Sequence, residues 1–218
     1  MILDNSSKNK LLNFLTKKEI KFEKNFDLKK KSWLKAGGIF EHFIEPSTYE
    51  QIIDLVKFLK ENDLDYYVVG NLSNIIFRDG NIETPIINIK NYKDIVVEDE
   101  PKKFKVNACC GISIFKFVSF VSQKLKISGL EGLVGIPGSL GGGIYMNASS
   151  YNSYISEYLK ELKYVNFDSE EIIIKKEDAE LEWRSSIFHK HKNTIILNAV
   201  FEFPKNNLTD TEIINRNI

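Results

Sequence analysis

The feature that most restricts the fold of this chain is a glycine-rich segment from residue 129 to residue 147, GLEGLVGIPGSLGGGIYMN. Seven of the twelve glycines of the chain lie in this segment. Because glycine weakens a helix or strand by roughly 0.5–1 kcal/mol relative to alanine, such a cluster indicates a backbone that turns sharply or lies very close to another group. Bare N–H groups in a glycine-rich turn form a site for anions, so we expect a phosphate-bearing ligand there. A crowded turn between two packed elements is the other interpretation that these residues allow.

Length and composition are those of an ordinary globular protein. The 218 residues are enough for one large domain or two small ones, and a hydrophobic content of 43% is enough for a sizeable core. Thirty basic residues balance thirty acidic ones, so the overall charge gives no reason to expect a nucleic-acid partner or an acidic membrane surface.

Neither a membrane span nor a secretory signal is predicted. No apolar run approaches the ~18–20 residues that a span needs, and the N-terminus lacks a charged region followed by an uninterrupted apolar one. The two cysteines, Cys109 and Cys110, are neighbours, and two cysteines make no disulfide framework. We therefore expect a cytoplasmic protein in which both cysteines are small core residues, and we expect no metal site.

The hydrophobic pattern alternates between helical and strand periods and predicts an α+β fold. Helices are expected over residues 7–20, 48–62 and 113–127. Strands are expected over residues 40–44, 66–69, 86–89, 95–97, 104–109, 158–167, 172–174 and 194–203, with a hairpin turn at Asp168-Ser169. A further apolar run, Ile75-Ile76-Phe77, is expected to form an element after the turn at residues 70–74. No G-x-G-x-x-G sequence joins a strand to a long helix, so a Rossmann site is not expected.

Four motifs occur in a fixed order along the chain. The central one is GIPGSLGG at residues 135–142, followed by Met146-Asn147-Ala148; the others are SWLKAGG at residues 32–38, VGNLSN at residues 69–74 and WRSSIF at residues 183–188. Together they resemble the motifs of the UDP-N-acetylenolpyruvoylglucosamine reductase (MurB) family, flavoenzymes of peptidoglycan precursor synthesis. The resemblance extends over roughly residues 25–203. One glycine motif alone would be a weak signal, whereas four in the right order are specific.

The resemblance implies an α+β, two-subdomain FAD-binding fold of the MurB or PCMH (vanillyl-alcohol-oxidase-like) type. Residues 1–92 are expected to form the first FAD-binding subdomain and residues 93–204 the second. Residues 205–218 are polar and weakly patterned, and they are expected to form a tail or a short helix. The third, substrate-binding domain of the family is then expected to be absent.

The resemblance also implies which residues hold FAD. A diphosphate needs several N–H donors with no β-carbons in the way, and two facing turns can supply them. The expected cofactor-binding residues are Gly70, Asn71, Leu72, Ser73 and Asn74 in the first turn, Gly135, Ile136, Gly138, Ser139 and Gly142 in the second, and Asn147 after it. NAD(P)H is implied as the hydride donor.

Arg184 is the residue that the resemblance assigns to catalysis. In the family, the matching arginine lies beside the substrate carboxyl and stabilises the charge that develops as the enolpyruvyl double bond accepts a hydride. A guanidinium suits this role because it is always charged and presents a planar fork of donors to carboxylate or enolate oxygens. A structural arginine that ties two loops together is the alternative.

The sequence departs from the family pattern at places that bear on activity. The family's reductases continue well beyond the strand that ends here near Phe203, and they carry there a serine acid and a late glutamate whose motifs are not found in this sequence. Leu72 stands where the family has glycine, and Ser185 where it has aspartate. The expected function is therefore that of a FAD-binding MurB-like protein, and whether it is an enzyme is left open.

Two kinds of function remain compatible with these residues. The first is an NAD(P)H-dependent reductase of a UDP-sugar enolpyruvyl ether in cell-wall or surface-polysaccharide synthesis, with a nucleotide sugar as substrate. The second is a flavin-binding paralogue without reductase activity, or an inactive homologue. In either case a partner chain or a second copy is expected to cover the open substrate face, since a missing domain exposes apolar surface.

Overall fold

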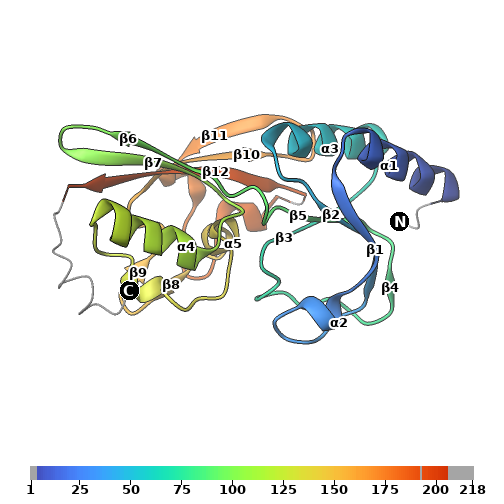
Figure 1. Ribbon diagram of the computed structural model, residues 1–218, viewed down its shortest axis with the longest axis horizontal. Coiled ribbons are helices and arrows are strands. Elements are labelled where there is room, and N and C mark those ends of the chain that lie inside the picture. The colour runs from blue at the N-terminus through green and yellow to red at the C-terminus, as the bar shows by residue number, and fades with distance from the viewer. Residues whose placement is uncertain (1–3, 192, 206–218) are drawn as a thin grey trace.

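Two β-sheets form the frame of the protein, seen in a computed structural model that describes residues 4–191 and 193–205 (Figure 1). The first sheet has the strand order β1-β2-β5-β3, with β4 also paired to β2. The strand β1 is antiparallel to β2, whereas the other pairs in this sheet are parallel. Its strands are β1 (Lys21–Asp27), β2 (Ile39–Glu45), β3 (Tyr67–Val69), β4 (Asn81–Ile82) and β5 (Ile86–Asn88).

The second sheet is antiparallel throughout and has the order β11-β10-β12-β7-β6. Its strands are β6 (Ile95–Asp99), β7 (Lys103–Cys109), β10 (Leu159–Val165), β11 (Glu171–Lys175) and β12 (Ile195–Pro204). A separate short hairpin is formed by β8 (Ser149–Ser150) and β9 (Ser153–Tyr154).

Helices cover these sheets and connect their strands. The α-helices are α1 (Asn5–Lys17), α2 (Leu28–Lys31), α3 (Tyr49–Glu61), α4 (Ile114–Ser119) and α5 (Leu140–Tyr145). Shorter pieces are the π-helical η1 (Phe120–Lys124) and the 3₁₀ turns η2 (Glu131–Leu133), η3 (Lys176–Ala179) and η4 (Ile187–His189).

The sequence explains why α3 forms where it does. Thr48 caps the helix, because its side-chain oxygen accepts a hydrogen bond from Gln51 N at 3.2 Å. Its buried residues recur at helical spacing and pack into the core: Ile52, Leu55, Val56 and Leu59. At the end of the helix, Asn62 Nδ2 donates to the oxygen of Phe58 at 2.8 Å.

Alternation along β12 places one face of the second sheet against the helices and the other in solvent. Phe201 and Phe203 are fully buried, and their rings lie 4.7 and 6.5 Å from the ring of Phe117 on α4. The alternate residues Val200 and Glu202 line the opposite face. Figure 1 shows α4 and α5 together on the buried face of this sheet.

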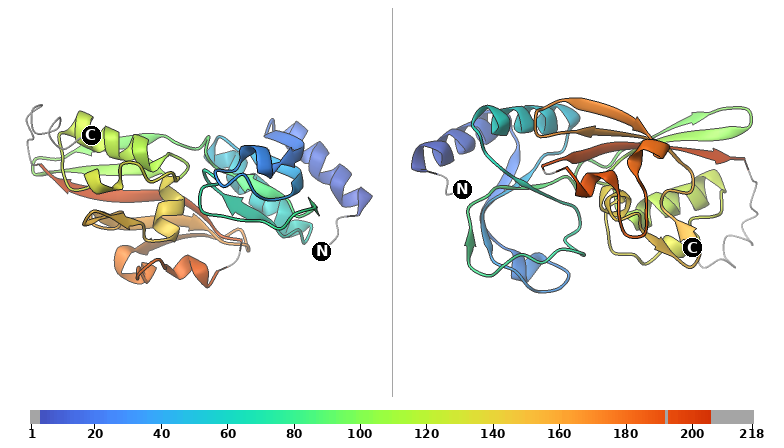
Figure 2. Two further views of the ribbon diagram at one scale, coloured as in Figure 1. Left: turned by 90° about the horizontal axis from the view of Figure 1, so that it is seen from below. Right: turned by 180° about the vertical axis from the view of Figure 1, so that it is seen from behind.

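One hydrophobic cluster extends across both sheets. It includes Leu11 and Ile52 from the N-terminal helices as well as Val106 and Phe201 from the second sheet. Polar contacts join the same two parts, since Lys163 Nζ donates to Tyr49 Oη at 2.8 Å. The two sheets lie side by side in the views of Figures 1 and 2, and Figure 1 shows α3 at the top of the molecule near the point where they meet.

Most of the predicted elements are found within a few residues of their expected bounds. These include the helices at α1 and α3, the strands from β2 to β12 that the pattern predicted, and the hairpin turn at Asp168-Ser169. The apolar run Ile75-Ile76-Phe77 forms no helix or strand, and the predicted helix over residues 113–127 divides into α4 and the π-helical η1. The division at residue 92 into two subdomains stays a prediction. Apart from Lys205, the predicted tail lies outside the described residues.

Several elements were not anticipated from the sequence, among them the short strands β4, β8 and β9 and three elements with identifiable causes. In β1 only Phe26 is buried, so the sequence shows little alternation of apolar and polar residues there. The strand forms because β2 provides a backbone partner for it. The lysine run of α2 carries no apolar pattern that would predict a helix, but it forms one helical turn anchored by the buried Leu28. The helix α5 has the sequence LGGGIY, which local propensity does not favour.

None of the helices in the described ranges combines the length and the apolar character that crossing a bilayer requires.

A buried histidine makes the stability of this fold dependent on pH. His42 on β2 is 1% exposed, and its Nδ1 has no hydrogen-bond partner among the described residues. Burial lowers the pKa of His42 below the ordinary value of 6.5; the nearby Lys8 and Lys24 also lower it, whereas Glu41 raises it. The unfolded chain therefore binds more protons below pH 6.5, and the free energy of unfolding falls as the pH drops from 6.5 toward the folded pKa.

Urea denaturation at about pH 7.5 and about pH 5.5 tests this expectation. The wild type should lose stability at the lower pH, and His42→Leu, which cannot titrate, should lose measurably less. An equal loss in the two proteins would show that His42 does not contribute.

Candidate functional site

The two glycine-containing turns identified in the sequence lie against each other in the structure. The first turn follows β3, and the second leads into α5, whose N-cap is Ser139. A β-carbon on Gly70 would lie 2.0 Å from Ser139 Oγ, and one on Gly138 would lie 4.0 Å from Ser73 Oγ. The turns therefore approach so closely that the first position can hold only glycine without a shift of the second turn.

The first turn is held in place by bonds from other segments. Asn88 Nδ2 at the end of β5 donates to the oxygen of Gly70 at 2.9 Å, and Trp33 N donates to the oxygen of Leu72 at 3.1 Å. Leu72 has a φ of +55° and is buried in the hydrophobic cluster of the first sheet. A left-handed backbone at a non-glycine residue costs on the order of 1–3 kcal/mol, and burial of the leucine side chain offsets that cost.

The second turn docks on the connection between β7 and α4. Gly141 N donates to the oxygen of Cys110 at 2.8 Å, and Leu140 N donates to the oxygen of Ile112 at 2.7 Å. A β-carbon on Gly141 would lie 3.1 Å from the β-carbon of Cys110. Glycine at this position thus lets α5 approach the connection closely enough for both bonds to form.

Backbone N–H groups on both turns have no hydrogen-bond partner within the described part of the chain. They are those of residues 71–77 in the first turn and of Gly135, Gly138 and Ser139 in the second. Gly135 has a φ of +93°, and no atom would lie within 4 Å of a β-carbon there. Unpaired N–H groups on two turns that contact each other, beside open space, are suited to accept a diphosphate. The residues present therefore fit a dinucleotide cofactor such as FAD.

Four other predicted cofactor residues, two on each turn, differ in their surroundings. Ile136 is half-buried against the core, and its N–H donates to the oxygen of Leu133 at 3.2 Å. Gly142 is exposed, and its N–H donates to the capping Ser139 Oγ at 3.2 Å. In the first turn, Asn71 and Asn74 are exposed.

Asn147 uses its side-chain amide within the protein. Its Nδ2 donates to the oxygen of Glu182 at 3.0 Å, and its Oδ1 accepts a hydrogen bond from Ser156 Oγ at 2.8 Å. The direct contact with a cofactor that the resemblance assigns to Asn147 stays a prediction. Through its bond to Glu182, the Asn147 side chain anchors the loop that carries Arg184.

Arg184 lies at the tip of a tight turn. Glu182 and Ser185 exchange backbone hydrogen bonds of 3.2 and 3.3 Å, and Arg184 has a φ of +53°. Its guanidinium is exposed, lies 5.1 Å from the centre of the Trp183 ring, and donates from Nη2 to the oxygen of Ser149 at 3.3 Å. The arginine therefore does tie two loops together, while much of its guanidinium faces solvent.

The Arg184 turn is docked on the last residue of α5, Tyr145. Ser186 Oγ donates to the oxygen of Tyr145 at 2.8 Å, and the ring of Tyr145 lies 4.2 Å from that of His189. Because α5 has six residues, its two ends are about 9 Å apart. The helix thus joins the unpaired N–H groups at its start to the Arg184 turn at its end.

Sequence reasoning missed several residues that position the site. Asn88 and Ser156 make the bonds described above but belong to none of the four motifs, so only their polar character could have identified them. Ser186 lies in the WRSSIF motif, which could have identified it. Exposed apolar side chains also gather on the site loops, at Trp33 (66% exposed), Ile76 (70%), Tyr151 (91%) and Trp183 (78%).

Both cysteines are free thiols in the core, as expected. Burial raises the pKa of the Cys110 thiol well above its ordinary value, so this side chain stays protonated. Asn198 Nδ2 lies 3.6 Å from Cys109 Sγ. Within the described residues, no group of three or more His, Cys, Asp or Glu side chains is arranged to hold a metal ion.

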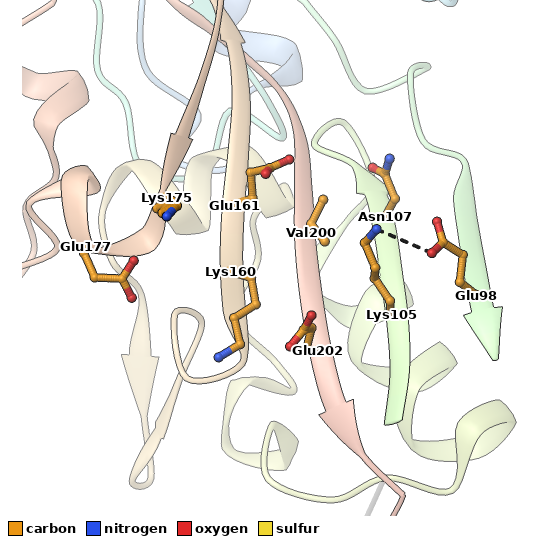
Figure 3. Close-up of a pocket in the computed structure, with 9 residues that line it drawn as sticks. All are labelled: Glu98, Lys105, Asn107, Lys160, Glu161, Lys175, Glu177, Val200 and Glu202. Carbon is orange, nitrogen blue, oxygen red and sulfur yellow. Dashed lines mark hydrogen bonds and ion pairs between the residues drawn. The ribbon is translucent and has the colours of Figure 1, made fainter. Parts of the chain in front are cut away.

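A shallow hollow of about 420 Å³ lies on the solvent face of the second sheet (Figure 3). Lysines and glutamates alternate along it, and Figure 3 shows the ion pair of Lys105 with Glu98. Another pair joins Lys103 to Glu202 at 2.7 Å. Such a face of mixed and paired charges is typical of a solvated sheet, and it lies on the side away from α4.

Comparison of the sequence with protein-family models shows the family to which the chain belongs. Residues 40–174 match the family described as FAD binding domain, which is more than half of the chain. The chain belongs to this FAD-binding domain family. The match includes the first turn and the whole glycine-rich segment.

Curated relatives give a more specific likeness. The chain is 33% identical over 196 residues to the UDP-N-acetylenolpyruvoylglucosamine reductase of Clostridium novyi, covering 90% of this chain and 61% of that protein. It is 34% identical over 175 residues to the enzyme of the same name from Clostridium botulinum strain Hall, covering 80% and 55%. This chain thus spans about three fifths of the length of these relatives.

Solved structures show the same fold. MurB from Thermus caldophilus superposes with a TM-score of 0.68 at 22% identity, covering 90% of this chain and 66% of that one. p-Cresol methylhydroxylase superposes with a TM-score of 0.66 at 11% identity, covering 95% and 45%. The predicted MurB or PCMH-type fold and the MurB resemblance are therefore confirmed.

A double-mutant cycle tests the contact between the two turns. Gly70→Ala should lower the free energy of unfolding by about 1–3 kcal/mol, because its methyl group overlaps Ser139. Ser139→Gly removes the overlapped atoms and keeps a residue tolerated at an N-cap, so the double variant should recover most of the loss. Gly80→Ala, at a left-handed position away from Ser139, should show no recovery with Ser139→Gly. Additive losses at Gly70 and Ser139, measured by urea denaturation, would contradict the contact.

Proposed function

We propose that this chain binds FAD between the turns at residues 70–74 and 135–142 and reduces an enolpyruvyl ether on a UDP-sugar. The observation that carries the proposal is the set of unpaired N–H groups on both turns beside the open backbone at Gly135. The N–H groups of Asn71 to Asn74 and of Gly138 and Ser139 would hold the diphosphate. Ile136, Gly142 and Asn147 would lie along the rest of the cofactor. Membership of the FAD-binding domain family supports this assignment.

When bound, FAD supplies the means to pass a hydride from NAD(P)H to the acceptor. Hydride addition to an enolpyruvyl alkene leaves negative charge that spreads onto the neighbouring carboxylate. The guanidinium of Arg184 offers several N–H donors to those oxygens, and its bond to Ser149 and its stacking on Trp183 fix its orientation. The second alkene carbon takes its proton from solvent or from an acid outside the described residues.

A flavoprotein without reductase activity is the second candidate. It is favoured by the bond from Arg184 to Ser149, which a purely structural arginine would make as well. In that case the turns would still hold FAD, and Arg184 would serve only to join two loops.

Anaerobic flavin spectroscopy distinguishes the two candidates. The purified protein should show flavin absorbance, and NAD(P)H should bleach it. Reoxidation by UDP-N-acetylglucosamine enolpyruvate without oxygen would support the reductase, whereas bleaching without reoxidation by the sugar would support the second candidate. Protein that neither retains nor rebinds FAD would contradict both.

Gly142→Ala separates folding from cofactor binding. Gly142 is exposed inside α5, and a β-carbon there would lie 3.2 Å from Ser139 Oγ. The gain in helix propensity and this tight contact oppose each other, so the free energy of unfolding of the apoprotein should change by less than about 1 kcal/mol. The same methyl group would occupy space along the proposed cofactor site and should weaken FAD binding by at least about tenfold, or ~1.4 kcal/mol. Differential scanning calorimetry and FAD titration measure the two effects, and unchanged FAD affinity would remove Gly142 from the site.

Arg184→Ala should lower kcat by at least about 10²-fold, because it removes the donors proposed for the developing charge. The FAD dissociation constant should stay within about twofold, since the turns that hold the diphosphate are untouched. Lys190→Ala, which removes an exposed cation on the same loop, is the matched control and should turn over at the wild-type rate. Equal turnover in the Arg184 and Lys190 variants would show that Arg184 is structural.

A further inference from the structure

The second sheet ends in two edge strands, β11 and β6. Within the described ranges, β11 pairs with β10 alone and β6 with β7 alone. An edge strand presents a row of unpaired N–H and C=O groups that another strand can join. Figure 1 and the rear view of Figure 2 both show β11 at the outline of the molecule.

The sequence around β11 is self-complementary in charge. Residues 170–176 read EEIIIKK, with two acidic residues before three isoleucines and two basic residues after them. The side chains of Glu171, Ile173 and Lys175 share the exposed face of the strand, while Ile172 and Ile174 pack against the core. Ile173, at the centre, is 59% exposed.

We propose that two copies of this chain pair through β11 as antiparallel strands related by a two-fold axis at Ile173. In this register each Ile173 lies opposite Ile173 of the second copy, and Ile172 lies opposite Ile174. Each Glu171 lies opposite Lys175, and Glu170 and Lys176 add charges of the same signs just outside the two ends of the strand. The two five-stranded sheets then form one continuous sheet.

Charge selects this register over the alternatives. A parallel pairing places glutamates beside glutamates and lysines beside lysines, which is destabilising for residues directly opposite each other. An antiparallel pairing shifted along the strand brings charged side chains opposite isoleucine. Only the two-fold register pairs opposite charges at both ends and also buries the exposed Ile173.

The acidic end of β11 is fixed by contacts with both parts of the molecule. Lys163 Nζ lies 2.6 Å from Glu171 Oε2, which also accepts a hydrogen bond from the hydroxyl of Tyr49. The hydrogen bond from Lys163 is the main cause of a lowered pKa at Glu171, so this carboxylate stays charged. At the other end, Lys175 is exposed on the β11 side of β10 (Figure 3).

The opposite edge of the sheet has no such complementarity. β6 is preceded by Asp94 and ends with Glu98 and Asp99, so acidic residues flank it on both sides. Two-fold pairing through β6 would bring acidic side chains of two copies together. Its exposed residue Val96, at 61%, therefore serves as a control for Ile173.

Sedimentation velocity over a range of concentrations tests the proposal. The wild type should reach twice the chain mass of 25.2 kDa. Ile173→Lys, which places two lysines on the axis, should remain monomeric, whereas Val96→Lys should dimerise as the wild type does. A monomeric wild type, or a dimer that survives Ile173→Lys, would overturn the proposal.

Charge exchange gives a test that loss of folding cannot imitate. The double variant Glu170→Lys/Glu171→Lys and the double variant Lys175→Glu/Lys176→Glu should each be monomeric, because like charges then face each other at both ends. Their mixture should form a heterodimer, and circular dichroism checks that each is folded. Failure of folded variants to associate on mixing would count against the register.

Oxidative cross-linking gives a second measurement that does not depend on the charge variants. Directly opposite residues in an antiparallel pair have α-carbons about 4.5–5.5 Å apart, within the range of a disulfide. Ile173→Cys should therefore yield a disulfide-linked dimer on oxidation, and Val96→Cys should not. Equal cross-linking of the two variants would contradict a specific interface at β11.

Discussion

The close approach of Gly70 to Ser139 is the contact on which the candidate site depends. It joins the turn after β3, in the first sheet, to the N-cap of α5, beneath the second sheet. A β-carbon on Gly70 would overlap Ser139 Oγ and push the two turns apart. Similar close approaches occur in the glycine-rich segment, where a β-carbon on Gly132 would lie 2.3 Å from the oxygen of Ser150 and one on Gly141 would lie 3.1 Å from the β-carbon of Cys110. These contacts account for glycines that weaken regular structure by local criteria.

The helix α5 connects binding and chemistry in the proposed function. Its first residues follow the turn with the unpaired N–H groups, and its last residue, Tyr145, accepts a bond from Ser186 beside the Arg184 turn. Asn147, just beyond, holds the same turn through Glu182. Since both ends are fixed to one short and well-packed helix, a shift of the glycine segment would also displace the arginine. The same linkage explains why Arg184 can be both a tie between loops and a group directed at substrate.

The part of the chain that forms the first sheet contacts functional surfaces of the second part at more than one place. The turn at Gly70 completes the site, while Tyr49 at the start of α3 contacts the charged end of β11. One hydrophobic cluster continues beneath both regions, so the two sheets are held by packing as well as by polar bonds. A dimer formed at β11 would use the solvent edge of the second sheet, whereas the glycine segment docks on its other side through Cys110 and Ile112.

The sequence by itself determined the elements with strong periodicity and the positions in the chain of the two glycine-containing turns. The stripe of α3, its cap at Thr48 and the alternation of β12 are local patterns, and local patterns are readable from the chain. The helix α5, the left-handed Leu72 and the bonds of Asn88 and Ser186 were decided only by the tertiary structure. Each depends on a partner distant in sequence: Cys110 beneath Gly141, the core of the first sheet around Leu72, Gly70 beside Asn88, and Tyr145 beside Ser186. A residue chosen for a contact across the fold carries no local signature, because the reason for it lies in the other partner.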